Sequence, residues 1–429
     1  MYRLYSLTFT SSFFTKDSSS AAVGKVGRVI SRNLHLISMH TSPLSQPGDG
    51  DAGGMNVYIA SSMKAVLARY SELTLEVFTL DTAKDSPGYR RIDDGPRCTV
   101  HVLSLDQARG ARKEELPAYI AAFAAEIKAR ALAPADVVHS HYWLSGMAVR
   151  QYAPDVPWIH TMHTTAAVKN AHAGAGEPLE SQERFNGEQR IINDCSALVV
   201  NTPLEAQQMV EHYGAAHQKL HVIRPGVDTD IFYPEPKTNH SPTQAQLLFA
   251  GRPQPLKGPH IIIEALALLP ESLAVTLTMV GKSHSNYEQQ LIDRAHQLGI
   301  ENQVTVLPAM VASDLAQTMR QADIVLCPSS SETFGLVALE AQATGTPVIA
   351  TDVDGLTDAV KDEETGVLVA DRSPAAWAQA IEQLVQDPKK RQRLGRAGAN
   401  RSVSMSWSAA ADKTVKLYND LLTSRPLND

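Results

Sequence analysis

The sequence contains little of what marks a secreted, membrane-spanning or nucleic-acid-binding protein. It has three cysteines in 429 residues, Cys98, Cys195 and Cys327, each in or beside an apolar stretch. This wide spacing predicts buried, reduced thiols and a cytoplasmic protein rather than a disulfide framework. No run of about 20 apolar residues occurs, so we expect no membrane span. The net charge of −7 gives no sign of a nucleic-acid partner.

Two catalytic signatures are also missing. No G-x-G-x-x-G fingerprint follows a strand, which leaves a nicotinamide-dependent dehydrogenase as a distant alternative. The 15 histidines show neither H-E-x-x-H nor a three-ligand zinc spacing, so a catalytic metal held by histidines is not expected. His139 and His160 are instead predicted to be core or hydrogen-bonding histidines.

The chain is predicted to contain two α/β units. Short β-rich runs alternate with helical periods from residue 33, break off in a polar, proline-containing stretch, and restart at "QLLFAGR". A chain of this length also exceeds the roughly 250–300 residues at which single cores stop growing. We predict a disordered extension at 1–32, a Rossmann-like unit at 33–232, a linker at 233–246, a second Rossmann-like unit at 247–405, and a final helix at 406–429 that packs back across the junction. Ligands would bind in a cleft between the units.

A glycine-rich loop, "GDGDAGGMNVY" at 48–58, follows the first strand of the first unit. Glycines at 50, 53 and 54 let the backbone approach a ligand, and the amides of the following helix can face an anion. The alternative is a flexible strand–helix loop. Two cations, Arg252 and Lys257, lie in "GRPQPLKGP" directly after a strand of the second unit. They are placed to neutralise a departing diphosphate, unless they are simply solvated.

Two glutamates in "SSSETFGLVALEAQATGTP" raise the question of a ligand with hydroxyl groups at both ends. Glu332 precedes a predicted helix and Glu340 lies about one turn inside it, eight positions on. At the helical rise these eight steps span about 12 Å, the reach of a nucleotide-sugar from sugar ring to ribose. Carboxylates accept hydrogen bonds from vicinal hydroxyls, and the early helix amides attract the diphosphate between them. The alternatives are a helix-dipole acid at Glu332 and a solvated acid at Glu340.

Polar residues at the predicted strand ends of the first unit complete the pattern. His40 ends the first strand, Tyr142 follows "HSH", and His163 and Thr164 lie in "HTMHTTAAVKN". The carboxyl ends of parallel strands meet at one edge of the sheet, so these residues are expected at the cleft. His163 is predicted to face the donor.

With these residues assembled, the chain resembles the retaining glycosyltransferases of the GT-B fold, family 4, from about residue 33 to about 420. The paired acids and the Arg…Lys pair match that family. The stretches "ISMHTSPLSQPGDGDAGGMNVYI" and "HSHYWLSG" resemble its members that glycosylate inositol phosphate in mycothiol biosynthesis. The resemblance implies transfer of N-acetylglucosamine from UDP-N-acetylglucosamine to 1D-myo-inositol 3-phosphate, with the anomeric configuration retained, by a cytoplasmic homodimer.

The resemblance also implies roles for individual residues. The donor would contact Gln46, Pro47, Gly54, Arg252, Lys257, the backbone near Met310, Glu332 at the sugar and Glu340 at the ribose. The acceptor would contact His40, Asp51, Ala52, Gly53, Gly54, Met55, Asn56, Lys113, Tyr142, Thr164 and Arg184. At the position after Arg184 the family usually has a second arginine, where this chain has Phe185. The catalytic set would be His163, Glu332, Arg252 and Lys257, and no carboxylate is obviously placed as a nucleophile, which favours front-face displacement.

No cofactor is expected to take part in the chemistry. The family implies a structural Mg²⁺ near Met319, Arg320, Ala322 and Thr346, held mostly by backbone oxygens. Two rival functions stay open at this point. One is a family 4 transferase with another sugar-phosphate or inositol acceptor, and the other is a non-catalytic nucleotide-sugar-binding protein.

Overall fold

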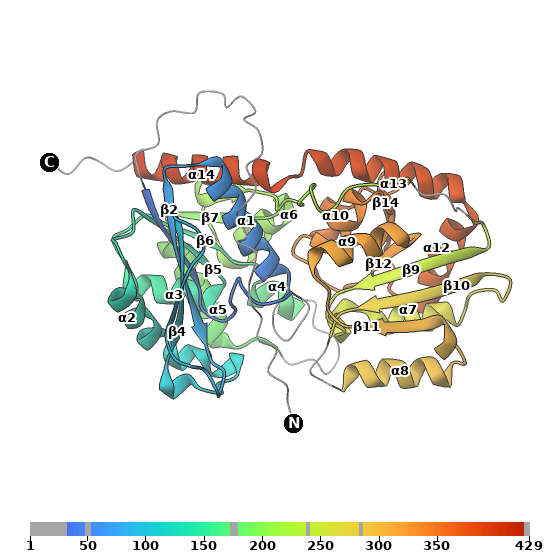
Figure 1. The fold of residues 1–429 in the computed structure, drawn as a ribbon, viewed down its shortest axis with the longest axis horizontal. Coiled ribbons are helices and arrows are strands. Elements are labelled where there is room, and N and C mark those ends of the chain that lie inside the picture. The colour runs from blue at the N-terminus through green and yellow to red at the C-terminus, as the bar shows by residue number, and fades with distance from the viewer. Residues whose placement is uncertain (1–31, 48–52, 172–178, 237–240, 283–285, 424–429) are drawn as a thin grey trace.

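The computed structural model describes residues 32–47, 53–171, 179–236, 241–282 and 286–423. Figure 1 shows two lobes side by side, each built on a largely parallel sheet with helices on both faces. This confirms the predicted α/β fold with two Rossmann-like units. The extension predicted at 1–32 lies outside the described residues except for Arg32.

The sheet of the first unit has eight strands in the order β3-β4-β2-β1-β5-β6-β7-β8. They are β1 (Arg32–Ser38), β2 (Leu73–Asp81), β3 (Arg90–Asp93), β4 (Cys98–Ser104), β5 (Val137–His141), β6 (Trp158–Thr161), β7 (Ala197–Val200) and β8 (Leu220–Val222). The helices are α1 (Gly54–Arg69), α2 (Ile120–Arg130), α3 (Trp143–Tyr152), α4 (Ala166–Ala171), α5 (Gln182–Asp194) and α6 (Pro203–Tyr213).

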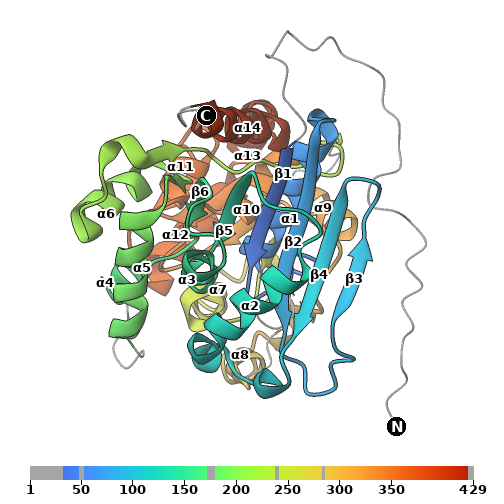
Figure 2. The ribbon, with the colours of Figure 1, turned by 90° about the vertical axis from the view of Figure 1, so that its left-hand side faces the viewer.

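The strand β3 is the one element of this sheet that departs from the predicted parallel alternation. It pairs antiparallel with β4 at the sheet edge (Figure 2) and all four of its residues are exposed. Three of the four are charged, which discourages pairing with another chain at this edge.

The sheet of the second unit has six parallel strands in the order β11-β10-β9-β12-β13-β14. They are β9 (Gln244–Ala250), β10 (Ala274–Val280), β11 (Val304–Leu307), β12 (Ile324–Cys327), β13 (Val348–Thr351) and β14 (Gly366–Val369). The helices are α7 (Pro259–Leu266), α8 (Tyr287–Gln297), α9 (Ala312–Gln321), α10 (Leu336–Ala343), α11 (Leu356–Ala359), α12 (Pro374–Gln386) and α13 (Pro388–Val403).

Both sheets have a point at which the strand order reverses. In the first unit it lies between β1 and β5, and in the second between β9 and β12. The central strands β5 and β12 are buried along their whole length. Ligands of such sheets bind outside the carboxyl ends of the strands at the reversal point. The fold therefore offers one such crevice on each unit.

Two chain segments cross between the units, and they lie against each other. The Val227 amide donates to the Met405 carbonyl at 2.8 Å, and Val227 forms a parallel bridge with Ser406. A Cβ on Gly226 would lie 2.1 Å from the Trp407 nitrogen, so only glycine permits this approach. The crossing is thus a narrow, closely packed joint.

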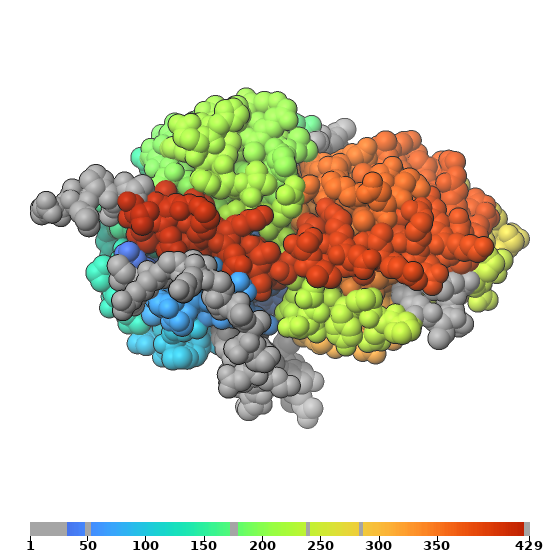
Figure 3. Space-filling model, turned by 90° about the horizontal axis from the view of Figure 1, so that it is seen from above, coloured from blue at the N-terminus to red at the C-terminus, as the bar shows by residue number. Residues whose placement is uncertain are grey.

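The final helix, α14 (Trp407–Thr423), packs on the first unit although it follows the second in sequence. Trp407, Val415 and Tyr418 belong to the apolar core on one face of the first sheet. Arg69 of α1 donates to both carboxylate oxygens of Asp412, at 2.6 and 2.8 Å. In Figure 3, which views the molecule from above, the red band that contains α13 and α14 runs across both units, so the end of the chain ties the two lobes together.

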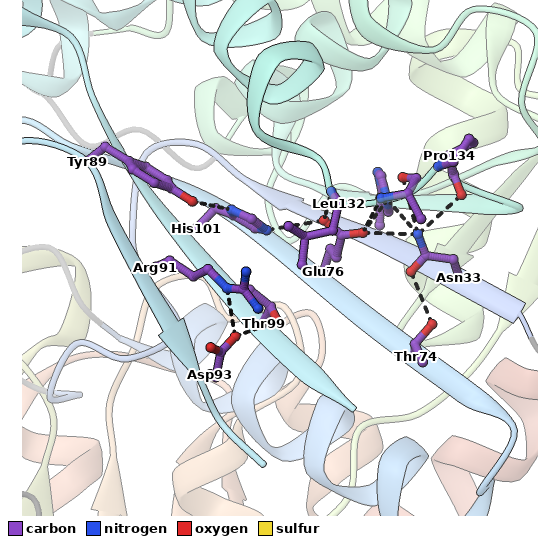
Figure 4. Close-up of polar contacts among 12 residues, drawn as sticks. Asn33, Thr74, Glu76, Tyr89, Arg91, Asp93, Thr99, His101, Leu132 and Pro134 are labelled. Carbon is purple, nitrogen blue, oxygen red and sulfur yellow. Dashed lines mark hydrogen bonds and ion pairs between the residues drawn. The ribbon is translucent and has the colours of Figure 1, made fainter. Parts of the chain in front are cut away.

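A buried polar cluster lies within the first sheet, centred on Glu76 of β2 (Figure 4). Its carboxylate is bonded by Asn33 (3.1 Å), His101 (3.2 Å) and the amides of Leu132 (2.7 Å) and Ala133 (3.2 Å), and His35 lies 3.4 Å away. Although burial alone would raise the pKa of Glu76, the hydrogen bonds from His101, His35 and the Leu132 amide hold it well below its usual value. Both carboxylate oxygens therefore have partners within the protein.

Other expectations can be compared with the described residues. Cys98, Cys195 and Cys327 are buried free thiols, as predicted. None of the helices in the described ranges is both long enough and apolar enough to cross a membrane.

Candidate active site between the two units

One half of the site is built on the first unit around the ring of Tyr142, which follows β5. The Lys113 ammonium lies 4.8 Å and the Arg184 guanidinium 4.9 Å from the ring centroid. The His40 ring, just after β1, lies 4.2 Å from the Tyr142 ring. Four residues predicted to bind the acceptor therefore meet at the reversal point of the first sheet. The two cations flanking one ring make this corner suitable for an anion.

Arg184 is held from several sides. Its backbone nitrogen is capped by the Ser181 hydroxyl at the start of α5, and its side chain is almost fully buried. The guanidinium pairs with Glu188 at 2.7 Å and Glu180 at 2.9 Å, and donates to the carbonyl and hydroxyl oxygens of Thr164 at 2.9 and 3.0 Å. Four of its five N–H groups are thus used within the described residues, which leaves one on Nη1 for a ligand.

The adjoining residue shows which way this part of α5 faces. The Phe185 ring stacks on Tyr213, with centroids 4.9 Å apart, and packs against the core. Arg184 is therefore the residue of this pair that reaches Tyr142, and the departure from the family at Phe185 leaves the cation corner intact.

The glycine loop brings the two units into contact. A Cβ on Gly53 would lie 3.3 Å from Nη2 of Arg252, and one on Gly54 would lie 3.7 Å from Leu336. Met55 packs between the core clusters of the first unit. The predicted acceptor residues Asp51 and Ala52 lie outside the described residues.

Asn56 uses its amide within this loop. The side chain accepts from the Gly53 nitrogen at 2.9 Å and donates to the Thr41 hydroxyl and the Ser42 carbonyl at 2.7 and 2.5 Å. Its side chain is buried, and these bonds hold the loop in place.

His163 lies where the first unit faces the second. Its φ is +63°, a left-handed conformation, and its carbonyl accepts a hydrogen bond from the Thr333 hydroxyl of the second unit. Its Nε2 lies 2.9 Å from Nδ1 of His141. Burial lowers the pKa of His163 to about 3, so the ring is neutral at physiological pH.

The other half of the site is built on the second unit. Lys257 forms an ion pair with Glu332, which joins the loop after β9 to the loop after β12. A Cβ on Gly258, whose φ is +70°, would lie 2.3 Å from the Pro328 carbonyl, so glycine permits this close approach. Burial raises the pKa of the Cys327 thiol to about 12, and Glu332, Lys257 and Glu340 all lie near enough to influence it. Three of the predicted donor residues, Lys257, Glu332 and Glu340, therefore lie near the end of β12.

The Glu340 carboxylate, on α10, differs from the others. Burial raises its pKa to about 8, with no ion pair or hydrogen bond from another described residue to offset that. By exposed area Glu340 is half-buried, and Glu332 is paired with Lys257. An acid left in this state is suited to accept hydrogen bonds from a ligand.

Charges from both units converge on His40. Burial lowers its pKa well below the usual value, and Lys113, His163, Arg184 and Arg252 lower it further. Its Nδ1 is buried without a hydrogen-bond partner among the described residues. Arg252, the predicted diphosphate cation, and the predicted acceptor residues Lys113 and Arg184 therefore all lie close enough to His40 to influence it.

Three predicted donor residues lie at the rim. The Gln46 side chain donates to the Met310 carbonyl at 2.8 Å, and Pro47 follows it in the same loop. This bond spans the two units, so the structure brings these positions together without a ligand between them.

The predicted metal residues gather elsewhere, at the end of α9. The Met319 carbonyl accepts from the Thr346 hydroxyl at 2.7 Å, and Ala322 caps the helix. The Arg320 side chain donates to the Ile231 carbonyl, just before the linker predicted at 233–246, at 3.2 Å. No cluster of three or more histidine, cysteine or acidic side chains suited to a metal occurs in the part of the chain that the structure describes.

Several supporting residues were not singled out from the sequence. Glu180 and Glu188 lie four positions before and after Arg184 and form ion pairs with it. Acids and bases at this helical spacing commonly pair, so the sequence could have predicted both contacts. Thr333 carries no comparable signal, because its partner His163 is distant in sequence.

Comparison with known proteins gives the same assignment for both units. The family model "Glycosyltransferase Family 4" matches residues 52–231, and "Glycosyl transferases group 1" matches 234–401. Curated relatives include the D-inositol 3-phosphate glycosyltransferases of Paenarthrobacter aurescens, 39% identical over 91% of this chain and 98% of its own length, and of Pseudarthrobacter chlorophenolicus, 41% identical over 90% and 95%.

Solved structures agree on the fold. Sucrose-phosphate synthase from Thermosynechococcus elongatus superposes with a TM-score of 0.83 at 28% identity, over 92% of this chain and all of that one. Anabaena HepE in complex with UDP-glucose superposes with a TM-score of 0.67 at 19% identity, over 91% of this chain and all of that one, and shows the fold alone. The relatives, matched over nearly their whole length, decide the family: this chain is a glycosyltransferase enzyme that belongs to the D-inositol 3-phosphate glycosyltransferase family.

Proposed function

We propose that the chain transfers N-acetylglucosamine from UDP-N-acetylglucosamine to 1D-myo-inositol 3-phosphate with retention of the anomeric configuration. The observation that carries the proposal is the pair of cations at the Tyr142 ring, beside His40, on which Arg252 of the second unit also acts. The activity named for the curated relatives supports the acceptor.

The acceptor phosphate would lie between Lys113 and Arg184. A phosphate dianion is best held by paired, charged donors, and Arg184 has one N–H left for it. The unpartnered Nδ1 of His40 lies beside this corner and would bond an inositol hydroxyl. The buried acids that hold Arg184 fix its direction, so the phosphate sets the register of the sugar ring.

The donor would lie along the second unit. Glu340 would accept from the ribose hydroxyls, Glu332 would bond the sugar hydroxyls, and the backbone of Met310 would meet the uracil. In this structure Gln46 occupies the Met310 carbonyl, so uracil binding there would replace that bond. Arg252 and Lys257 would hold the diphosphate between the two rings.

The cations would supply most of the rate enhancement. The bond between the anomeric carbon and the diphosphate oxygen breaks, and negative charge grows on that oxygen next to Arg252 and Lys257. The acceptor hydroxyl bonds to the same face of the sugar and passes its proton to the departing phosphate. Glu332 is committed to Lys257, so it is not placed as a nucleophile. Contact between the units at Thr333 and His163 would keep water out.

We also propose a structural Mg²⁺ at the end of α9. The Met319 carbonyl and the Thr346 hydroxyl lie in contact, and with the carbonyls of Arg320 and Ala322 they would supply an all-oxygen donor set, which suits Mg²⁺. The position beside the inter-unit linker gives it a role in stability, and a loss of thermal stability on chelation would support it. The homodimer stays a prediction, which sedimentation would test.

The decisive experiment offers a panel of acceptors with UDP-N-acetylglucosamine and reads the products by mass spectrometry. We expect product with inositol 3-phosphate and little with free inositol, and we expect inorganic phosphate to compete with the acceptor. The sugar-phosphate rival has a specific basis in the likeness to sucrose-phosphate synthase. Product with fructose 6-phosphate but none with inositol 3-phosphate would overturn the proposal in favour of that rival.

A further inference from the structure

A row of buried rings leads from the cleft into the first unit. The ring centroids of His163 and His141 lie 5.1 Å apart, and those of His141 and His139 lie 4.4 Å apart. His139 is fixed at its far end by the Thr161 hydroxyl at 2.9 Å and the Tyr418 hydroxyl of α14 at 2.8 Å. The row is therefore rigid. His141 is its middle ring, between His139 inside the unit and His163 where the two units meet.

The hydrogen bond between His141 and His163 joins two neutral rings. Burial lowers the pKa of His141 well below its usual value and that of His163 to about 3. One ring must therefore donate to the other through the 2.9 Å contact between Nδ1 of His141 and Nε2 of His163. The direction of this bond decides which nitrogen of His163 carries its proton.

The surroundings of His141 decide that direction. Its Nε2 is buried and has no hydrogen-bond partner among the described residues. A buried N–H without an acceptor is costly, so the His141 proton belongs on Nδ1, where it has one. His141 then donates to Nε2 of His163, and the His163 proton must be on Nδ1.

We propose that His141 is a positioning residue for the transfer, because it fixes the ring and tautomer of His163 so that Nδ1–H is the donor available at the cleft. The inference rests on the proposed function for its kinetic consequence, but not for the tautomer. Thr333 holds the His163 carbonyl from the second unit, and His141 holds the ring from the first. His163 is thus oriented from both sides of the cleft.

The matched variants use the shapes of the amide side chains. In His141→Asn the amide nitrogen takes the place of Nδ1 and can still donate to His163, whereas in His141→Gln it takes the place of Nε2 and cannot. His160→Asn is the control, because His160 is equally buried, also has an unpartnered Nε2, and bonds Ser140 rather than His163. All three variants remove a buried imidazole from the same unit.

We expect His141→Gln to lower kcat about tenfold, the cost of one lost buried hydrogen bond, with the donor KM changed less than about twofold. His141→Asn and His160→Asn should keep kcat within about threefold of the parent. Equal losses in the two His141 variants, or an equal loss in His160→Asn, would overturn the proposal, because packing alone would then explain the effect.

A spectroscopic measurement tests the tautomer without any substrate. In protein labelled with ¹⁵N-histidine, we expect the His163 signal to report a proton on Nδ1, and to change in His141→Gln but not in His141→Asn. A proton on Nε2 of His163 in the parent would overturn the proposal. If His141→Gln does not fold, the parent spectrum and His141→Asn still decide. Absence of transfer to inositol 3-phosphate in the parent protein would refute the proposed function and leave this measurement valid.

Discussion

Two carboxylates, one in each unit, contrast in how an acid is placed inside a protein: Glu76 is buried and Glu340 is half-buried. Glu76 lies among five donor groups within the first sheet, and its pKa is held well below the usual value. Glu340 lies at the cleft, where burial raises its pKa to about 8 and no described residue offsets that. A carboxylate with all its partners contributes to stability, whereas one without partners costs stability and is suited to a ligand.

The comparison extends to the cations. Arg184 and Lys257 are held by acids, yet both lie at the cleft, so their ion pairs orient them rather than simply neutralise them. The corresponding surface pair, Arg294 with Glu264, lies on the helices α8 and α7, outside the cleft. Position relative to the reversal points, more than the presence of an ion pair, separates functional from structural charge in this fold.

The largest effect is expected from Arg252→Ala. Loss of one cation from the departing diphosphate should lower kcat about 100- to 1000-fold, since the charge it stabilises develops in the transition state. Arg294→Ala is the control and should leave kcat unchanged. Steady-state rates of UDP release measure both, and a loss of less than about threefold in Arg252→Ala would remove the assigned role.

The next largest effect should appear in stability alone. In Glu76→Gln an amide nitrogen replaces one carboxylate oxygen, so hydrogen-bond donors that have an oxygen acceptor in the parent would face another donor. The variant should lower the free energy of unfolding by about 2–4 kcal/mol. Because the pKa of Glu76 is lowered by folding, its contribution is present above the unfolded pKa of about 4.3 and is lost as the pH falls through the folded value. Urea unfolding at pH 7 and below pH 4 should show the difference from the parent shrinking.

Glu340→Gln should have the opposite effect to Glu76→Gln: it should weaken UDP binding and leave stability intact. This variant should raise the Kd for UDP about tenfold, because hydrogen bonds to a charged acceptor are stronger than those to an amide. It should leave the free energy of unfolding unchanged or higher at pH 8, since it removes a poorly solvated charge. Calorimetric titration and urea unfolding of the same preparation decide, and an unchanged Kd would count against the ribose contact.

The smallest effect is a pH dependence of UDP binding. Ribose hydroxyls that donate to Glu340 favour its ionised form, so binding should lower its pKa from about 8 and release protons. The Kd should therefore fall a few-fold between pH 7 and pH 8.5, above the titration of the phosphate itself at about pH 6. The slope should vanish in Glu340→Gln, and a slope that survives there must come from another group.

The position of several site residues in the fold could be predicted from the sequence. His40, Tyr142, Arg252 and Glu332 were predicted from the rule that polar residues follow the ends of buried parallel strands, and they do lie there. The acceptor contact of Asn56 stays a prediction, and the structure adds that its side-chain amide bonds Gly53, Thr41 and Ser42. The family motif marks the position but says nothing of these bonds, which hold the loop.

The sequence by itself determined the number of units, their alternating strands and helices, and the edge at which polar chemistry collects, because periodicity and strand ends are local features of the chain. Only the tertiary structure decided which polar groups are satisfied and which await a partner. Glu76 depends on segments more than 50 positions away, His163 on Thr333 in the other unit, and His139 on Tyr418 in the final helix. Hydrogen bonds between such distant segments exist only once the sheets are assembled, so no local pattern records them.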